Sequence, residues 1–271
     1  MNYINILSLT ISAILSYIGS PMIFHMLTSS KTLSLNYKNE EIPICMGLLF
    51  IFVQIITVSM ILLLTRTKTI YMIYYLFALT LIGLVGLLDD LIGDKNVKGF
   101  KGHIKSFFKG GLTTGGIRAG IVFVISLFVS IIISKNITDI IANTLIIALF
   151  TNFTNLFDLR PGRSIKVFIL FSIIMLFTSN ISEYNFLLYS FYGILIIYFP
   201  LDLKAKAMMG DVGSNVLGIT LGVYCAFTHS LIWKFIYLFI LIAVHILAEK
   251  VSFSKIIENN KVLKFIDDLW R

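Results

Sequence analysis

Apolar residues along the chain fall into runs whose lengths approach the 20 or so residues that a helix needs to cross a bilayer. The runs cover residues 3–27, 44–64, 70–88, 119–134, 140–157, 166–179, 186–201, 212–228 and 231–248. The sixth is the shortest of these runs. The pattern predicts an all-α fold: a polytopic integral membrane bundle of about nine transmembrane helices.

The connecting segments alternate between basic and nearly neutral, which predicts the topology. Segments 28–43, 89–118, 158–166 and 202–211, with the tail from 249, carry 18 of the Lys and Arg residues, and the opposite set carries 4. Because cytoplasmic loops are enriched in cations, we expect the N-terminus outside and the C-terminus in the cytoplasm. The net charge of +8 is thereby explained by topology, and no nucleic-acid partner is expected.

The chain is predicted to have two parts. Residues 1–250 form the transmembrane domain, and residues 251–271 form an amphipathic cytoplasmic tail. In the tail, apolar residues recur at helical spacing with cations between them, which predicts one helix on the anionic inner leaflet. The apolar positions are Ile256, Ile257, Val262, Leu263, Phe265, Ile266, Leu269 and Trp270.

Adjacent carboxylates at the end of the third run are the strongest functional clue. Asp89 and Asp90 follow Leu88 directly, at the negative end of a helix dipole, where charged carboxylates are costly. Protonation, a metal ion or nearby cations would relieve this cost. A charged pair that marks the water-facing end of a span is the alternative.

The fifth run closes with polar side chains spaced three apart, Asn152, Asn155 and Asp158. Steps of three residues spread the trio over only about 120° of a helix, so they can face one cavity. The two asparagines can equally hydrogen-bond between helices. Arg163, in the turn that follows, can bind phosphate or serve as a positive-inside anchor.

Two further cytoplasmic segments combine glycine with polar donors. Asp211 lies between Gly210 and Gly213 before the eighth run, where it can cap a helix or take part in a site. Residues 99–105 interleave glycine with Lys101, His103 and Lys105. A lone histidine there is often just a solvated loop residue.

In this order, four short segments resemble the polyprenyl-phosphate N-acetylhexosamine-1-phosphate transferase superfamily, which includes phospho-N-acetylmuramoyl-pentapeptide transferase. They are Ile42-Pro-Ile-Cys-Met-Gly47, Gly86-Leu-Leu-Asp-Asp90, Asn152-Phe-Thr-Asn-Leu-Phe-Asp158 and Met209-Gly-Asp-Val-Gly-Ser214. The resemblance implies an enzyme of the bacterial plasma membrane. It would transfer a sugar-1-phosphate from a UDP-sugar to undecaprenyl phosphate at the cytoplasmic face, release UMP and serve cell-wall or surface-glycan synthesis.

The resemblance also implies roles for individual residues. Asp89, Asp90 and Asp211 would be catalytic, and Asn155 with Asp211 would hold Mg²⁺, which Mn²⁺ can replace. The lipid phosphate and the nucleotide sugar, UDP-GlcNAc or UDP-MurNAc-peptide, would contact a larger set of residues. That set comprises Asp158, Asn152, Arg163, Lys101, His103, Lys105 and Lys38. A homodimer is compatible with this scheme.

Departures from the family pattern affect the nucleotide end of the site. The family's Asp-Gly-x-x-Gly-Leu is Asp158-Leu-Arg-Pro-Gly-Arg163 here, and the His-rich last loop and a tenth helix are missing. Three alternatives stay open: a lipid-linked sugar transporter or flippase, a catalytically inactive family member acting as a scaffold, and a related transferase that uses another nucleotide-activated sugar or alcohol phosphate. A transporter should carry charged groups near the bilayer midplane.

Overall fold

The structure is a computed structural model that describes residues 3–65, 69–93 and 113–269. Apart from one small hairpin, its regular elements are helices, so the all-α prediction is confirmed. In chain order they are α1 (Tyr3–Ser29), β1 (Leu33–Leu35), β2 (Glu41–Pro43), α2 (Leu48–Thr65), α3 (Thr69–Ile92), α5 (Thr114–Ile133), α6 (Ile137–Phe157), α7 (Arg163–Thr178), α8 (Phe186–Leu203), α9 (Gly210–Thr228), α10 (Leu231–Lys250), α11 (Phe253–Asn259) and α12 (Lys261–Asp268).

Seven helices among the described residues are long and apolar enough to cross a membrane: α1, α2, α3, α5, α6, α8 and α10. This identifies an integral membrane protein. The other two apolar runs also form helices, but α7 has only 16 residues and α9 is more polar. Nine spans and their orientation therefore stay a prediction.

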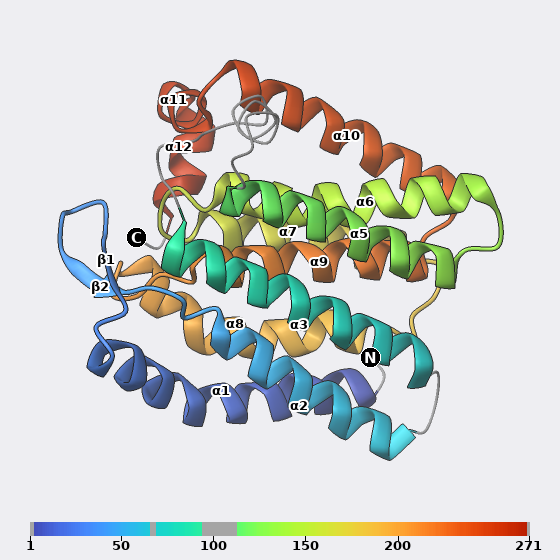
Figure 1. Ribbon diagram of the computed structural model, residues 1–271, viewed down its shortest axis with the longest axis horizontal. Coiled ribbons are helices and arrows are strands. Elements are labelled where there is room, and N and C mark those ends of the chain that lie inside the picture. Colours follow the sequence, from blue (N-terminus) through green and yellow to red (C-terminus); the bar gives the residue numbers. More distant parts are fainter. Residues whose placement is uncertain (1–2, 66–68, 94–112, 270–271) are drawn as a thin grey trace.

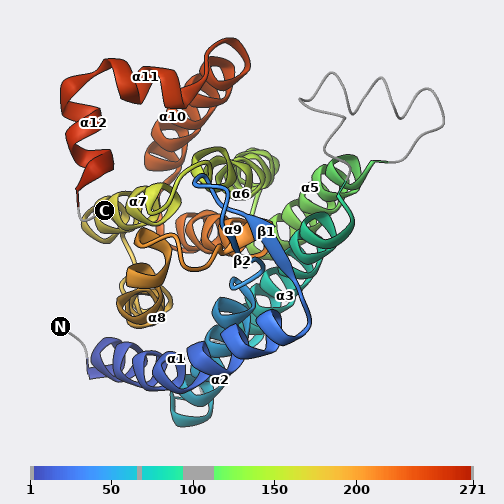
Figure 2. The ribbon, with the colours of Figure 1, turned by 90° about the vertical axis from the view of Figure 1, so that its left-hand side faces the viewer.

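Helix α9 runs through the middle of the bundle, with α3, α6, α7 and α8 around it (Figures 1 and 2). Nearly all of its side chains are buried. Because its neighbours rather than lipid cover it, α9 tolerates polar residues that an outer helix would not. A Cβ on Gly218 would lie 2.6 Å from Thr151 Cα of α6, and one on Gly222 would lie 2.7 Å from Ile147 Cα. Glycine at these positions lets the two backbones approach closely.

A buried polar network ties four helices together. Gln54 of α2 donates to the Tyr75 hydroxyl of α3 (3.0 Å), which contacts the Thr220 hydroxyl of α9 (3.0 Å). Ser190 of α8 donates to the Gln54 amide oxygen (2.6 Å). These side chains are neutral and satisfied by one another, so they serve as interhelical hydrogen bonds.

The up-and-down path of the chain gathers distant segments at one end of the bundle (Figure 1). The end of α3, the start of α5, the end of α6 and the start of α9 meet there. The hairpin and the C-terminal helices lie at the same end, so the acidic segments of the sequence share one face.

The hairpin β1–β2 lies within a segment that the sequence pattern predicts as a loop. Its strands pair antiparallel with Ser34 opposite Ile42. Asn36 organises the turn: its side-chain oxygen accepts from the backbone N–H groups of Lys38 (2.8 Å) and Glu40 (3.0 Å). Its amide nitrogen donates to the Ala205 carbonyl (3.2 Å), which fastens the hairpin to the loop before α9.

The tail consists of two short helices rather than the one helix that the spacing predicts. Asn260 separates them, because its side-chain oxygen accepts from the N–H groups of Val262 and Leu263 and so caps a new helix. The amphipathic character is present in α12, where Val262 and Phe265 are exposed and Asp267 is buried.

Candidate active site

Asp90 caps α9 from a neighbouring helix. Its Oδ1 accepts from the Asp211 N–H (2.9 Å) and its Oδ2 from the Val212 N–H (3.2 Å). The Cys45 thiol lies 3.7 Å from the same Oδ2. Asp211 is therefore inside the first turn of α9, and the capping role that its position suggests belongs to Asp90 instead.

Glycines make this close approach of α3 and α9 sterically possible. Gly210 has φ +69°, and a Cβ there would collide with the Asp90 carboxylate. A Cβ on Gly86 would lie 2.6 Å from the carbonyl oxygen of Asp211. The glycines in two of the family-like segments are thus needed to bring the acids together.

Backbone pairing holds the loop before α9 in place. The Met46 and Gly47 N–H groups donate to the carbonyls of Met208 and Met209, both at 3.0 Å, and the Met208 N–H donates to the Pro43 carbonyl (2.9 Å). Three backbone hydrogen bonds therefore join the segment before α2 to residues 208–209. They fix where α9 begins and hence where Asp211 lies.

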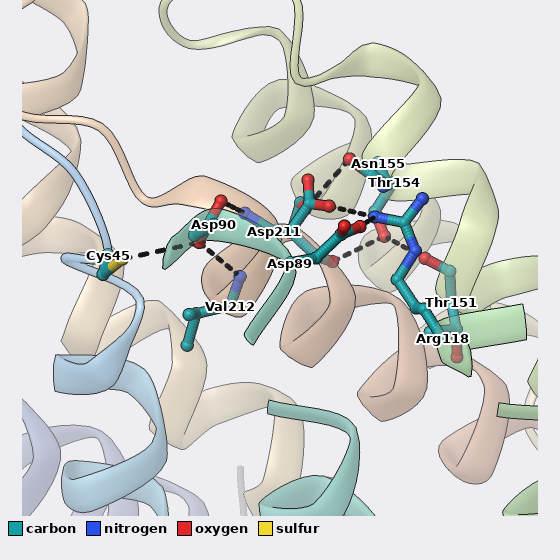
Figure 3. Close-up of polar contacts among 10 residues, drawn as sticks. Cys45, Asp89, Asp90, Arg118, Thr151, Thr154, Asn155, Asp211 and Val212 are labelled. Atoms are coloured by element: carbon teal, nitrogen blue, oxygen red, sulfur yellow. Dashed lines mark hydrogen bonds and ion pairs between the residues drawn. The ribbon is translucent and has the colours of Figure 1, made fainter. Parts of the chain in front are cut away.

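Arg118 of α5 points its guanidinium at the remaining acids, Asp89 and Asp211 (Figure 3). Its Nη1 is 2.7 Å from Asp89 Oδ2 and also pairs with Asp211 Oδ2. The Asn155 amide, oriented by its partners, donates to Asp211 Oδ1 (3.0 Å) and accepts from Arg118 Nη1 (3.0 Å). Side chains from four helices thus converge, with one guanidinium facing two carboxylates.

Asp158 lies next to this cluster, at the C-terminal end of α6. Burial raises the pKa of its carboxyl well above the usual range, and the carboxylates of Asp202, Asp211 and Asp90 raise it further. Asp202 accepts from the Gly162 N–H (2.6 Å) and so shapes the turn that follows Asp158. The carboxyls of Asp158, Asp202, Asp211 and Asp90 thus lie within electrostatic range of one another, a local setting that favours a bound cation.

Arg163, which the sequence offers as a phosphate ligand or an anchor, binds the tail. Its Nε and Nη2 donate to the two oxygens of Asp267 (2.7 and 2.8 Å), and its Nη1 donates to the Ser254 hydroxyl (2.9 Å). Both ionic side chains are buried. In this arrangement its donors bind the tail, and none points toward the acid cluster formed by Asp89 and Asp211.

The other expected substrate-binding residues are dispersed or undescribed. Lys38 is exposed on the hairpin, with its Nζ 5.5 Å from the centre of the Tyr37 ring. Asn152 is exposed on α6, so the structure does not bring it into the cluster with Asn155. Lys101, His103 and Lys105 lie outside the described residues.

The donor set around Asp211 suits a hard divalent cation. No group of three or more His, Cys, Asp or Glu side chains forms a metal site within residues 3–65, 69–93 and 113–269. Mg²⁺ does not need one, since it takes one or two protein oxygens and completes its shell with water and phosphate. Asp211 and Asn155 supply such oxygens, and a positive group, the Arg118 guanidinium, already lies against them.

Arg118 is the site residue that sequence reasoning missed. The sequence pattern places it only among the cations that set topology, because the positive-inside rule gives every cytoplasmic Arg or Lys the same meaning. The sequence pattern places Arg118 in the loop before the fourth run, whereas in the structure it is the fifth residue of α5, where a charge needs a partner.

No protein-family model matches this chain, and no curated protein matches it in sequence. The resemblance therefore depends on the short segments themselves and on whether their side chains meet. Of the four residues that it makes catalytic or metal-binding, Asp89, Asn155 and Asp211 meet around Arg118. Asp90 anchors the helix that carries Asp211.

Proposed function

We propose that this protein transfers a sugar-1-phosphate from a UDP-sugar to a polyprenyl phosphate and releases UMP. The observation that carries the proposal is the convergence of Asp89, Asn155 and Asp211, which are far apart in sequence, at one end of the bundle. Phosphoryl transfer depends mainly on positioning and charge neutralisation, and carboxylates with a bound cation supply both.

In this scheme each acid has a task that follows from its surroundings. Asp211 and Asn155 hold Mg²⁺, which would neutralise the donor's diphosphate when bound. Asp89, whose Oδ2 contacts the same Nη1 of Arg118 as Asp211 does, is placed to accept a proton from the lipid phosphate or orient it. Asp90 is a positioning residue, because both of its oxygens already accept backbone N–H groups of α9.

The location of the charges favours a transferase over a flippase. In the seven candidate spans, every described Asp, Glu, Lys and Arg lies within five residues of a helix end. Deeper in the bundle, Gln54 and Tyr75 are neutral and bonded to each other. A substrate path through the midplane would need exposed polar or charged groups there.

The cation asymmetry of the sequence predicts that this end of the bundle faces the cytoplasm. Single cysteines introduced at Lys255 and Lys135 should react with an impermeant thiol reagent from opposite sides of the membrane. Labelling of both from one side would contradict the assignment.

UMP release is the direct test of the reaction. Purified protein in detergent or nanodiscs is incubated with Mg²⁺, undecaprenyl phosphate and a panel of UDP-sugars. We expect UMP and a lipid-linked diphosphate sugar with one donor, and neither product without the lipid or with EDTA. A protein that binds a donor yet forms no UMP with any of them would instead be the inactive scaffold.

A further inference from the structure

One atom of Arg118, Nη1, contacts the side chains to which the proposed function assigns metal binding and proton transfer. Nη1 contacts Asp89 Oδ2 (2.7 Å), Asp211 Oδ2 and the Asn155 amide oxygen (3.0 Å). Among the described residues, Arg118 is the one cation that forms an ion pair with these acids. It therefore offsets part of their charge when no other cation is present.

A divalent ion on Asp211 and Asn155 would lie next to that guanidinium. Two like charges a few ångströms apart in a half-buried site repel each other strongly, and they would share the same carboxylate. The Asn155 oxygen that accepts from Nη1 is also the oxygen that a metal would need. Arg118 and the metal thus compete for two ligands at once.

The surroundings of Arg118 leave room for its side chain to move. The side chain keeps 21% of its surface exposed. Glycines flank it on α5 at positions 116 and 120, and a Cβ on Gly120 would meet nothing within 4 Å. Arginine also binds phosphate in a bidentate manner, so a displaced guanidinium has a ligand in the donor's diphosphate.

We propose that Arg118 is the resting counter-ion of the acid cluster, and that Mg²⁺ displaces it from Asp211 and frees it for the donor's diphosphate. The inference depends on the proposed function and adds an exchange step to it. Its first consequence is that Arg118 weakens metal binding in the absence of substrate.

Metal affinity measures this competition without any turnover. Mn²⁺ is titrated into the purified full-length protein, and free Mn²⁺ is followed by electron paramagnetic resonance. We expect Arg118→Gln to bind Mn²⁺ at least about tenfold more tightly than wild type, because one repelling charge and one competitor are removed. Asp211→Asn should lose the binding. Arg160→Gln is the matched control, since it removes a cation at the same end that stacks on Tyr37 and touches none of the acids.

A second pair of variants keeps the test decisive if the Arg118→Gln protein fails to fold because of its excess negative charge. Asp89→Asn is compared with Asp89→Asn/Arg118→Gln, which has the balance restored, and the double variant should bind Mn²⁺ the more tightly. Equal or weaker affinity in the variants without Arg118 would overturn the inference, as would unchanged Mn²⁺ binding in Asp211→Asn. These results are separate from UMP release, whose absence in wild type would refute the transferase alone.

Discussion

Two arginines at the same end of the bundle are held in opposite ways. Arg163 has one acidic partner, Asp267, which it binds through two parallel hydrogen bonds with side chains only 5% and 8% exposed. Arg118 is shared between Asp89, Asp211 and the Asn155 amide, and its side chain is 21% exposed. The charges of Arg163 and Asp267 match one to one, whereas the two carboxylates around Arg118 carry more negative charge than one guanidinium can neutralise.

The difference separates a structural ion pair from a poised site. Breaking a buried bidentate ion pair destabilises the protein, and such a pair leaves no position for another ligand. A cation spread over several acids leaves carboxylate oxygens for a further positive group. Changes at Arg163 should therefore act on the docking of the tail, and changes around Arg118 should act on chemistry.

The largest effect is expected at Asp211 in the acid cluster. Asp211→Asn or Asp89→Asn should lower UMP release by about 10² to 10⁴ fold, because loss of a metal ligand or base removes about 3 to 5 kcal/mol of transition-state stabilisation. Asp139→Asn is the control, since Asp139 lies at the other end of the bundle and pairs with Lys234 at 3.8 Å. Near-normal turnover in Asp211→Asn would make that residue structural and remove the contrast between the two arginines.

Breaking the Arg163–Asp267 pair should release the tail. Arg163→Met removes the guanidinium that donates two hydrogen bonds to the buried carboxylate of Asp267, and breaking a buried ion pair costs about 3 to 5 kcal/mol. Hydrogen exchange of the α12 amides should report the opening. The double variant Arg163→Met/Asp267→Leu removes both charges and should recover much of the protection. Unchanged protection in Arg163→Met would show that other contacts, such as the 4.9 Å stacking of Phe157 on Phe253, hold the tail alone.

The raised pKa of Asp158 gives the acid-rich end a pH dependence. Above the ordinary carboxyl pKa of 3.8, Asp158 keeps its proton in the folded protein but loses it in the unfolded chain. Its contribution to stability is therefore greatest below that pH and falls as the pH rises toward the folded-state pKa, by at most about 1.4 kcal/mol for each pH unit. Thermal unfolding between about pH 4 and 8 should show this decline in wild type, and a shallower one in Asp158→Asn. Equal slopes would mean that Asp158 is not the group responsible.

The helices could be predicted because a helix that crosses a bilayer needs about 20 apolar residues in a row, and such runs are visible in the sequence. Apolar runs such as 70–88 and 231–248 correspond to α3 and α10, and polar residues at run ends pointed to Asp89 and Asp211. The ends of an up-and-down bundle meet, so the acids of distant segments could be grouped in advance. The amphipathic pattern of the tail runs on through Asn260, so it predicts one helix, whereas the side chain of Asn260 caps a second one.

The pairing of charges could not be predicted in the same way. Arg118 and Arg163 both follow the positive-inside rule, and their surroundings differ only in which acids the fold brings to them. Asp267 is 104 residues from Arg163, and Asp211 is 93 residues from Arg118. Such contacts depend on tertiary geometry, which composition and spacing do not encode. From the sequence alone, Arg163 is expected to bind phosphate or to act as an anchor, and Arg118 only to set topology. In the structure, Arg163 binds the tail and Arg118 binds Asp89 and Asp211.

The smallest effect concerns the helix end next to the Arg163 pair. Lys166 donates from its Nζ to the carbonyls of Ile266 (2.9 Å), Asp267 (2.7 Å) and Leu269 (2.9 Å), at the C-terminus of α12. A cation there satisfies end carbonyls and complements the helix dipole, which is worth about 0.5 to 1 kcal/mol. Lys166→Met should therefore raise hydrogen exchange in α12 by about two- to fivefold, far less than Arg163→Met does. Lys204→Met, an exposed lysine at the same end, should leave exchange unchanged. If Lys166→Met loosens the tail as much as Arg163→Met, the tail is held chiefly by its capped carbonyls, and the buried ion pair is not what distinguishes this region from the acid cluster.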